Sequence, residues 1–166
     1  MSFIIRQGDE KDVSGIMKLV RELALFERAP EAVVNTEKML LTDGFGKHSL
    51  YKVVVAEAVD TNDVIGMALY YTAYSTWKGK MFFLDDLVVT ESYRNFGIGR
   101  KLINEFLKAA KYEEVNEIRW QVLNWNTPAI EFYKSLNVNF EPEWITVKMN
   151  KEQIEKYLAT VGSSSK

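Results

Sequence analysis

Arg94-Asn95-Phe96-Gly97-Ile98-Gly99 is the stretch of sequence that decides the fold. It follows Met81–Val89, which is apolar at nearly every position and is therefore predicted to be a strand buried on both faces. It precedes Gly99–Ala110, in which apolar residues recur at helical spacing. Two glycines one residue apart let the backbone turn tightly and approach a ligand closely. The stretch therefore predicts a buried strand, a glycine loop and an amphipathic helix in succession.

The start of this predicted helix is a candidate phosphate site. Free backbone N–H groups and the positive end of the helix dipole bind phosphate or pyrophosphate, and Arg94 and Arg100 add positive charge. A P-loop needs Gly-Lys-Ser/Thr, whereas Gly99 is followed by Arg100-Lys101-Leu102. A dinucleotide fingerprint needs a third glycine, where Leu102 stands. The alternative of a strand-to-helix turn that holds no ligand stays open on these residues alone.

Strands and helices alternate on either side of the loop. Before it we expect a strand at Phe3–Gln7 and a helix that Asp9 caps, with Glu10 and Asp12 in its first turn, running to about Glu27. We also expect a weaker helix at Thr36–Thr42 and strands at Tyr51–Ala58 and Val64–Tyr74. After it we expect a strand at Glu117–Leu123, a helix capped by Thr127, a strand pair at Val138–Phe140 and Trp144–Met149, and a helix at Lys151–Ala159. The three central strands form an antiparallel meander. The predicted class is α/β of the α+β mixed kind, a mostly antiparallel mixed sheet with helices on both faces.

The composition restricts the kind of protein. A chain of 166 residues fits one domain, which we expect at residues 1–160, followed by a disordered tail at 161–166. The absence of cysteine excludes disulfides and thiolate metal sites, and a single histidine, His48, disfavours a zinc site or a Ser/His/Asp relay. The net charge of −2 is not that of a nucleic-acid binder. With no secretory signal or membrane span visible, we expect a cytoplasmic protein without metal, nucleic-acid or membrane partners.

The glycine loop resembles the acyl-CoA loop of the GNAT superfamily of N-acetyltransferases. Ile5-Arg6 followed by Asp12, and Asn126-Thr127-Pro128-Ala129-Ile130-Glu131-Phe132-Tyr133-Lys134, resemble the start and the later helix of that family. Five further motifs resemble its diamine acetyltransferases, which include the spermidine/spermine and thialysine enzymes: Glu22-Leu23-Ala24-x-Phe26-Glu27, Asp43-Gly44-Phe45-Gly46, Tyr70-Tyr71, Tyr74-x-x-Trp77-x-Gly79-Lys80 and Trp125-Asn126. The resemblance spans about residues 3–160.

This resemblance implies the GNAT fold, a homodimer, and direct acetyl transfer from acetyl-CoA to a primary amine of a small polycationic or lysine-like substrate. It also implies the residues that hold acetyl-CoA, which the family contacts largely through backbone groups. They are Leu87, Val88, Val89, Arg94, Asn95, Phe96, Gly97, Ile98, Gly99, Arg100, Asn126, Ala129 and Tyr133.

Asp85 and Asp86 are the unexpected residues of the buried strand, because buried charge is costly without partners. Neighbours on a regular strand point to opposite faces, although a bulge brings two neighbours to one side. The family has a Glu-Asp pair here, which implies that Asp85, one methylene shorter, assists amine deprotonation. The resemblance also implies that Tyr133 protonates the departing CoA thiolate. The alternatives are a strand-end cap or ion pair for the aspartates and simple packing for Tyr133.

A cationic amine requires carboxylates and aromatic faces. We expect the charge from Glu27, Asp85 and Asp86 and the walls from Phe26, Tyr74 and Trp77. Solvated helix-end charge remains the alternative for Glu27. Two other functions also stay open: an acyl-CoA sensor without turnover, and a protein or peptide N-acetyltransferase of the same fold.

Overall fold

The computed structural model describes residues 2–163, and the chain divides after Gln121 into two compact units. The first unit holds β1 (Phe3–Gln7), η1 (Glu10–Asp12), α1 (Val13–Phe26), η2 (Pro30–Ala32), α2 (Glu37–Phe45), β2 (Lys52–Ala58), β3 (Val64–Ser75), β4 (Gly79–Val89), η3 (Glu91–Tyr93), α3 (Ile98–Tyr112) and β5 (Glu117–Arg119). The second unit, which starts at Val122, holds α4 (Thr127–Lys134) and α5 (Lys151–Ser163).

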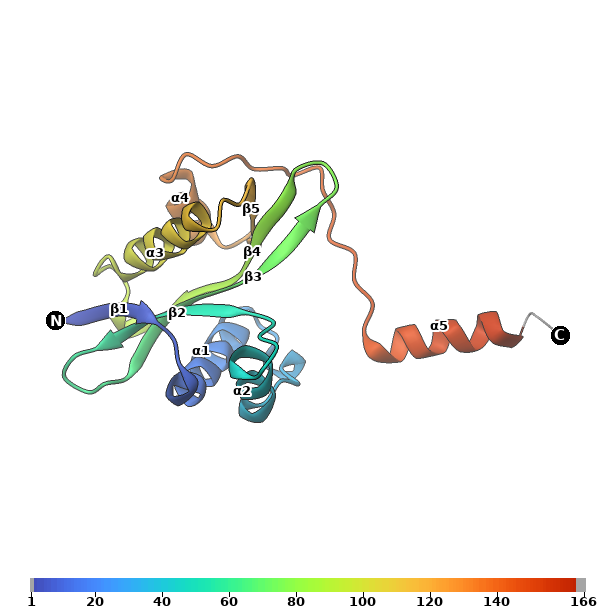
Figure 1. Ribbon diagram of the computed structural model, residues 1–166, viewed down its shortest axis with the longest axis horizontal. Helices are drawn as coiled ribbons and strands as arrows, with labels where there is room; N and C mark the ends of the chain where they lie inside the picture. Colours follow the sequence, from blue (N-terminus) through green and yellow to red (C-terminus); the bar gives the residue numbers. More distant parts are fainter. Residues whose placement is uncertain (1, 164–166) are drawn as a thin grey trace. The chain divides into compact units, whose positions relative to one another are not determined.

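One mixed sheet with the order β1-β2-β3-β4-β5 organises the first unit. The strands from β1 to β4 pair in antiparallel fashion, whereas β5 is parallel to β4. In Figure 1, α1 and α2 lie on one face of this sheet and α3 lies on the other. The predicted meander and the predicted fold class are confirmed.

Each face of the sheet has its own apolar core. Under α1 and α2, buried Ile16, Met17 and Leu19 pack with residues of β2, β3 and β4, among them Met67, Leu69 and Val88. Under α3, the rings of Tyr70 and Phe82 lie 5.0 Å apart between centroids, and Tyr70 lies 4.9 Å from Phe106 of α3. The sheet is therefore buried on both faces at its centre, as the apolar sequence of β4 predicts.

A charged network ties the start of α1 to the edge of the sheet. Both guanidinium Nη atoms of Arg6 on β1 donate to Asp12, at 2.6 and 2.7 Å, and its Nε donates to Glu57 of β2 at 2.9 Å. Asp12 is 5% exposed and also accepts the backbone N–H of Asp9 at 2.8 Å, which completes the capping box of η1. Asp9 therefore caps this short 3-10 turn and not α1 itself, whose N-cap is Asp12. The network raises the pKa of Arg6 above its ordinary value, mainly through the hydrogen bond to Asp12. The Arg6…Asp12 spacing in the sequence thus has a structural reason.

Three sequence-based predictions of local structure in the second half are wrong. The strand pair at 138–140 and 144–149 is absent from the described residues, which are irregular from 138 to 150. A two-stranded hairpin by itself is only marginally stable in water, and the described part of the second unit contains no further strand to extend it. The strand predicted to reach Leu123 ends at Arg119. The N-cap of α4 is Asn126 and not Thr127, because the Asn126 side chain accepts the Ala129 N–H.

The terminal helix is longer than predicted. Helix α5 runs to Ser163, so residues 161–163 of the expected tail are helical, and 164–166 lie outside the described residues. Ile154, Tyr157, Leu158 and Val161 continue one apolar helical face past Ala159. No helix in residues 2–163 is long and apolar enough to cross a membrane.

Arg6→Met is expected to lower the free energy of unfolding by about 3 kcal/mol, because it leaves the buried Asp12 carboxylate without its cation. Chemical denaturation measures the loss. Lys108→Met is the matched control, since Lys108 pairs with Glu105 at 2.6 Å on the exposed face of α3; its loss is expected below about 0.5 kcal/mol. Equal losses in the two variants contradict the assigned role of Arg6.

Candidate functional site

A β-bulge at Asp85 shapes the middle of β4. Leu69 of β3 faces Asp86, but the next residue, Tyr70, faces Leu84, so Asp85 is an extra residue without an opposite partner. Leu84 lies on the α3 face with Tyr70, and Asp86 lies on the α1 face with Leu69. Asp85, one step from Leu84, therefore also lies on the α1 face. The bulge brings both aspartates to one side of the sheet.

Glu27 joins this pair from α1, where it is the C-cap residue. Burial raises the pKa of Asp86 to about 7, with the negative charges of Asp85 and Glu27 adding to the effect. Burial also raises the pKa of Asp85, the more exposed of the two. None of the three side chains forms an ion pair within the part of the chain that the structure describes. A concentration of unneutralised negative charge therefore lies beside the end of α1, which favours a cationic ligand.

An aromatic pair missed by the sequence reasoning lies beside these carboxylates. Tyr71 and Phe83 are opposite each other in the β3–β4 register, and their rings stack with centroids 5.4 Å apart. Tyr71 is two residues from Leu69 and shares its face of the sheet. Burial, and then the charge of Asp85, raise the pKa of Tyr71. Alternation along β3 predicts that Tyr71 shares a face with Leu69. Only the bulge in β4 shows that Asp85 also lies on this face.

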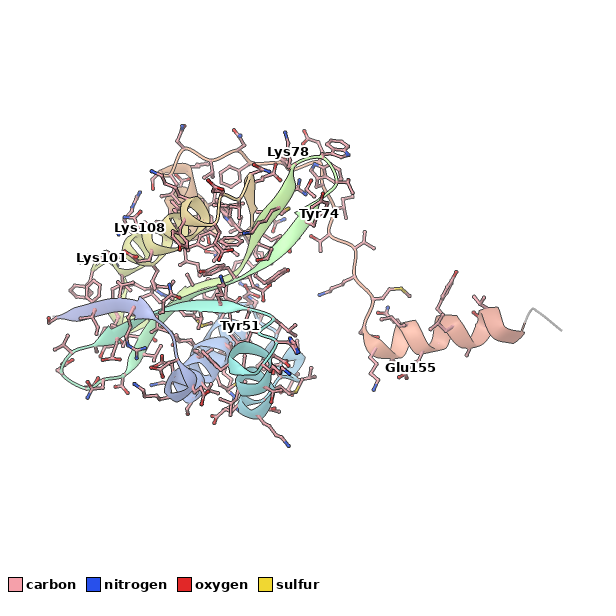
Figure 2. All side chains as sticks on the ribbon, in the orientation of Figure 1. Tyr51, Tyr74, Lys78, Lys101, Lys108 and Glu155 are labelled. Carbon is pink, nitrogen blue, oxygen red and sulfur yellow. The ribbon has the colours of Figure 1, made fainter. Side chains whose placement is uncertain are left out.

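Tyr74 and Trp77 lie at the far end of the β3–β4 hairpin, where Figure 2 shows Tyr74 beside the turn. Tyr74 faces Lys80, five residues from Asp85, which corresponds to about 17 Å along a strand. It belongs to the opposite face of the sheet from Tyr71 and is 77% exposed, and Trp77 is 85% exposed in the turn. Within the first unit, the structure therefore does not place Tyr74 and Trp77 next to Asp85 and Asp86, although the sequence predicts that they line the amine site.

Phe26 lies on the site's side of α1. It is 39% exposed, and the guanidinium carbon of Arg94 lies 5.7 Å from its ring centroid, over the ring. This cation–π contact connects the helix to the glycine loop. Arg94 also donates from Nε to the Val89 carbonyl at 3.0 Å, so its side chain folds back on the end of β4.

The two glycines of the loop have different roles. Gly97 is the N-cap of α3 in the left-handed region, with φ of 78°, and a Cβ built there meets no atom within 4 Å. Its side chain position is open space from which a ligand can approach the backbone. A Cβ on Gly99 would lie 3.9 Å from Cγ2 of Val89, so Gly99 lies where α3 packs on β4. Asn95 also has a positive φ, 67°, while Phe96 and Arg100 are exposed and Ile98 is buried.

Only part of β4 is paired with β5. Its pairing with β5 covers Met81↔Glu117 to Phe83↔Arg119 only, so the register stops before the bulge. Leu87, Val88 and Val89 follow on a stretch that β5 does not pair. Unpaired strand backbone can hydrogen-bond an extended ligand, and a helix N-terminus can bind a phosphate group.

The remaining predicted residues belong to the second unit. Asn126 Oδ1 accepts the Ala129 N–H at 3.3 Å, so this side chain caps α4. Tyr133 of α4 is 7% exposed, and its ring centroid is 5.5 Å from that of Phe132. Within residues 2–163 no group of three or more His, Cys, Asp or Glu side chains is arranged to hold a metal ion.

Comparison with solved structures gives the same architecture. An integron cassette protein from V. cholerae superposes with a TM-score of 0.75 at 24% identity, over 95% of this chain and 98% of that one. An aminoglycoside acetyltransferase from an uncultured soil metagenomic sample, in complex with trehalose, superposes with a TM-score of 0.73 at 19% identity, over 89% and 95%. At these identities the likeness shows the fold.

Comparison of sequences shows the family as well as the fold. The chain is 38% identical to the thialysine N-epsilon-acetyltransferase of Bos taurus over 143 residues, which covers 82% of this chain and 84% of that protein. It is 34% identical to the Mus musculus protein of the same name, over 92% and 95%. It is 32% identical to the human spermidine/spermine N(1)-acetyltransferase-like protein 1, over 92% of this chain and 23% of that protein. The model of the acetyltransferase (GNAT) family matches residues 18–137. The chain therefore belongs to the acetyltransferase (GNAT) family and is an N-acetyltransferase.

Proposed function

We propose that this protein transfers an acetyl group from acetyl-CoA directly to a primary amine of a small dication or polycation, such as thialysine or a diamine. The observation that carries this proposal is the cluster of Glu27, Asp85 and Asp86, which has no counter-cation among the described residues and lies in the same unit as the glycine loop. The names of the relatives at 38% and 34% identity support a lysine-like amine.

The residues of the first unit fit acetyl-CoA. The open side of Gly97 and the N-terminus of α3 suit the pyrophosphate, and the β4 edge at Leu87, Val88 and Val89 suits the pantetheine amides. Acetyl-CoA supplies the activated acetyl thioester. The protein binds and orients it through backbone groups, so the side chains at these strand positions are free to pack in the core.

The carboxylates bind the ammonium group and accept its proton. Asp86, whose pKa of about 7 lies closest to neutrality, is the better-matched proton acceptor, directly or through a water. Asp85, which the sequence resemblance assigns as the base, then contributes charge beside it. Glu27 binds the second cationic group, and Phe26, Tyr71 and Phe83 line the approach. Tyr133 of α4 is the proposed donor of a proton to the thiolate that leaves.

A substrate panel tests the function. The purified protein is incubated with acetyl-CoA and with thialysine, lysine, putrescine, spermidine, spermine or a lysine-containing peptide, and CoA release is measured. We expect dicationic small amines to react faster than the peptide. Release no faster than hydrolysis for every amine contradicts an enzyme. If acetyl-CoA binds tightly under those conditions, the result supports an acyl-CoA sensor.

Asp86→Asn is expected to lower kcat by roughly 10²–10⁴-fold, the range of a general base. In the unaltered protein kcat/KM should fall as the pH drops below about 7, where Asp86 becomes protonated, and the variant should lack this decline. Steady-state kinetics from pH 5.5 to 8.5 measure both effects. Asp60→Asn, in an exposed turn, is the control. A variant that retains the decline shows that another group accepts the proton.

Asp86→Asn is also expected to change how the free energy of unfolding depends on pH. The pKa of Asp86 is higher in the folded protein than in the unfolded chain, so ionisation destabilises the fold and stability falls as the pH rises from about 4 to about 7. Asp86→Asn should match the parent near pH 4 and exceed it by roughly 2–4 kcal/mol above pH 7. Denaturation at the two pH values measures this difference, which also shows that lost activity is not lost folding.

Tyr133→Phe is expected to reduce kcat by roughly 10²–10⁴-fold while changing acetyl-CoA affinity less than about threefold, because only a proton donor is removed. Phenylalanine keeps the ring that packs near Phe132. Turnover and calorimetric titration give the two values, and Phe132→Leu is a packing control. If Tyr133→Phe leaves kcat unchanged, a group other than Tyr133 donates the proton to the thiolate.

A further inference from the structure

Glu22 of α1 makes two hydrogen bonds that the proposed chemistry does not use. Its Oε1 accepts the backbone N–H of Glu91 at 2.8 Å, and its Oε2 accepts the hydroxyl of Thr90 at 3.0 Å. The partners are 68 and 69 residues away in the chain, and Glu22 is half-buried. Thr90 connects β4 to η3, and Glu91 is the first residue of η3, which directly precedes the glycine loop. One carboxylate thus joins a helix to the segment that starts this loop.

The next turn of α1 reinforces the connection. Phe26 lies beneath the Arg94 guanidinium at 5.7 Å, and Arg94 in turn donates to Val89, the last residue of β4. Glu27 follows at the end of the helix and lies close enough to Asp86 for its charge to act on that carboxyl. The last two turns of α1 therefore contact the loop that would hold acetyl-CoA and the carboxylates that would hold the amine.

We propose that Glu22 is a positioning residue that holds the β4-to-loop connection in its binding geometry, so that the phosphate-binding backbone is ordered before acetyl-CoA arrives. The inference rests on the proposed function. The physical reason is that a loop ordered only on binding lowers the apparent affinity by the fraction of time it spends in the competent form. Hydrogen bonds accepted by an ionised carboxylate are stronger than neutral ones, which suits Glu22 to this role.

The structure also indicates which variants separate positioning from plain packing. Glu22→Ala removes both acceptors. Glu22→Gln keeps the side-chain shape, since its amide oxygen can accept the Glu91 N–H while its amide nitrogen donates to Thr90 Oγ1. Thr90→Val removes one of the two donors and keeps the branched shape of the side chain. Glu105→Gln, on the exposed face of α3, is a control for loss of a helix-surface carboxylate.

Calorimetric titration with acetyl-CoA, steady-state kinetics and thermal unfolding are measured on each full-length variant. In Glu22→Ala we expect Kd and KM for acetyl-CoA to rise by about 10-fold, as for the loss of hydrogen bonds to a charged group, while kcat at saturating acetyl-CoA stays within about threefold. Glu22→Gln should recover most of the affinity. The Glu22→Ala/Thr90→Val double variant should bind no more weakly than Glu22→Ala alone, because the two changes remove the same contact.

Two results overturn the inference. One is an affinity in Glu22→Ala within twofold of the parent protein. The other is a kcat loss that saturating acetyl-CoA does not restore and that follows the fall in unfolding temperature, which marks a purely structural role. If Glu22→Ala does not fold, Thr90→Val decides in its place, with an expected rise in Kd of about threefold. Failure of the proposed function is distinct, because then the parent protein itself neither binds acetyl-CoA nor releases CoA.

Discussion

The pairing of β3 with β4 is the constraint on which the rest of the first unit depends. Ten residue pairs from Gly66↔Val89 to Ser75↔Gly79 form the longest register in the sheet. This hairpin supplies the inner faces against which both α1 and α3 pack, so its register decides which side chains enter which core. The single extra residue, Asp85, cannot be paired without shifting every later side chain to the wrong face. The bulge absorbs it and leaves two carboxylates side by side.

Such an arrangement opposes folding locally. Leu69 and Val88 flank Asp86 in an apolar core, where an isostere without charge would be more stable. Local sequence choices that conflict with packing in an otherwise consistent fold mark places where function outweighs stability. The Arg6–Asp12–Glu57 network is the contrast within the same unit, because there each charged side chain has a partner of opposite charge.

The sequence predicts the elements of the first unit well because each has a strong local signal. Strand alternation, the Asp9 cap and the glycines of the loop act within a few residues of their effects. The bulge was foreseen only as an option, since strand register depends on pairing across the hairpin. The sequence does not indicate Tyr71 and Phe83 as site residues for the same reason. Only a motif resemblance predicts Tyr74 and Trp77 there, and the register sets Tyr74 five residues along β4 from Asp85. The strand pair at 138–140 and 144–149 failed because alternation in sequence shows a tendency to pair, whereas an isolated two-stranded hairpin is only marginally stable in water.

The short pairing between β4 and β5 has a consequence for the edge of β4 itself. Within the first unit, as far as the structure describes it, the β5 pairing on this side of β4 ends at Phe83. Bare strand edges are templates on which other chains add, and natural proteins blunt them with charge, twist or a bulge. Asp85 and Asp86 bring two of these safeguards, negative charge and a bulged backbone, to the point where the pairing with β5 ends. The same two residues are thus expected to oppose the addition of another strand at this point.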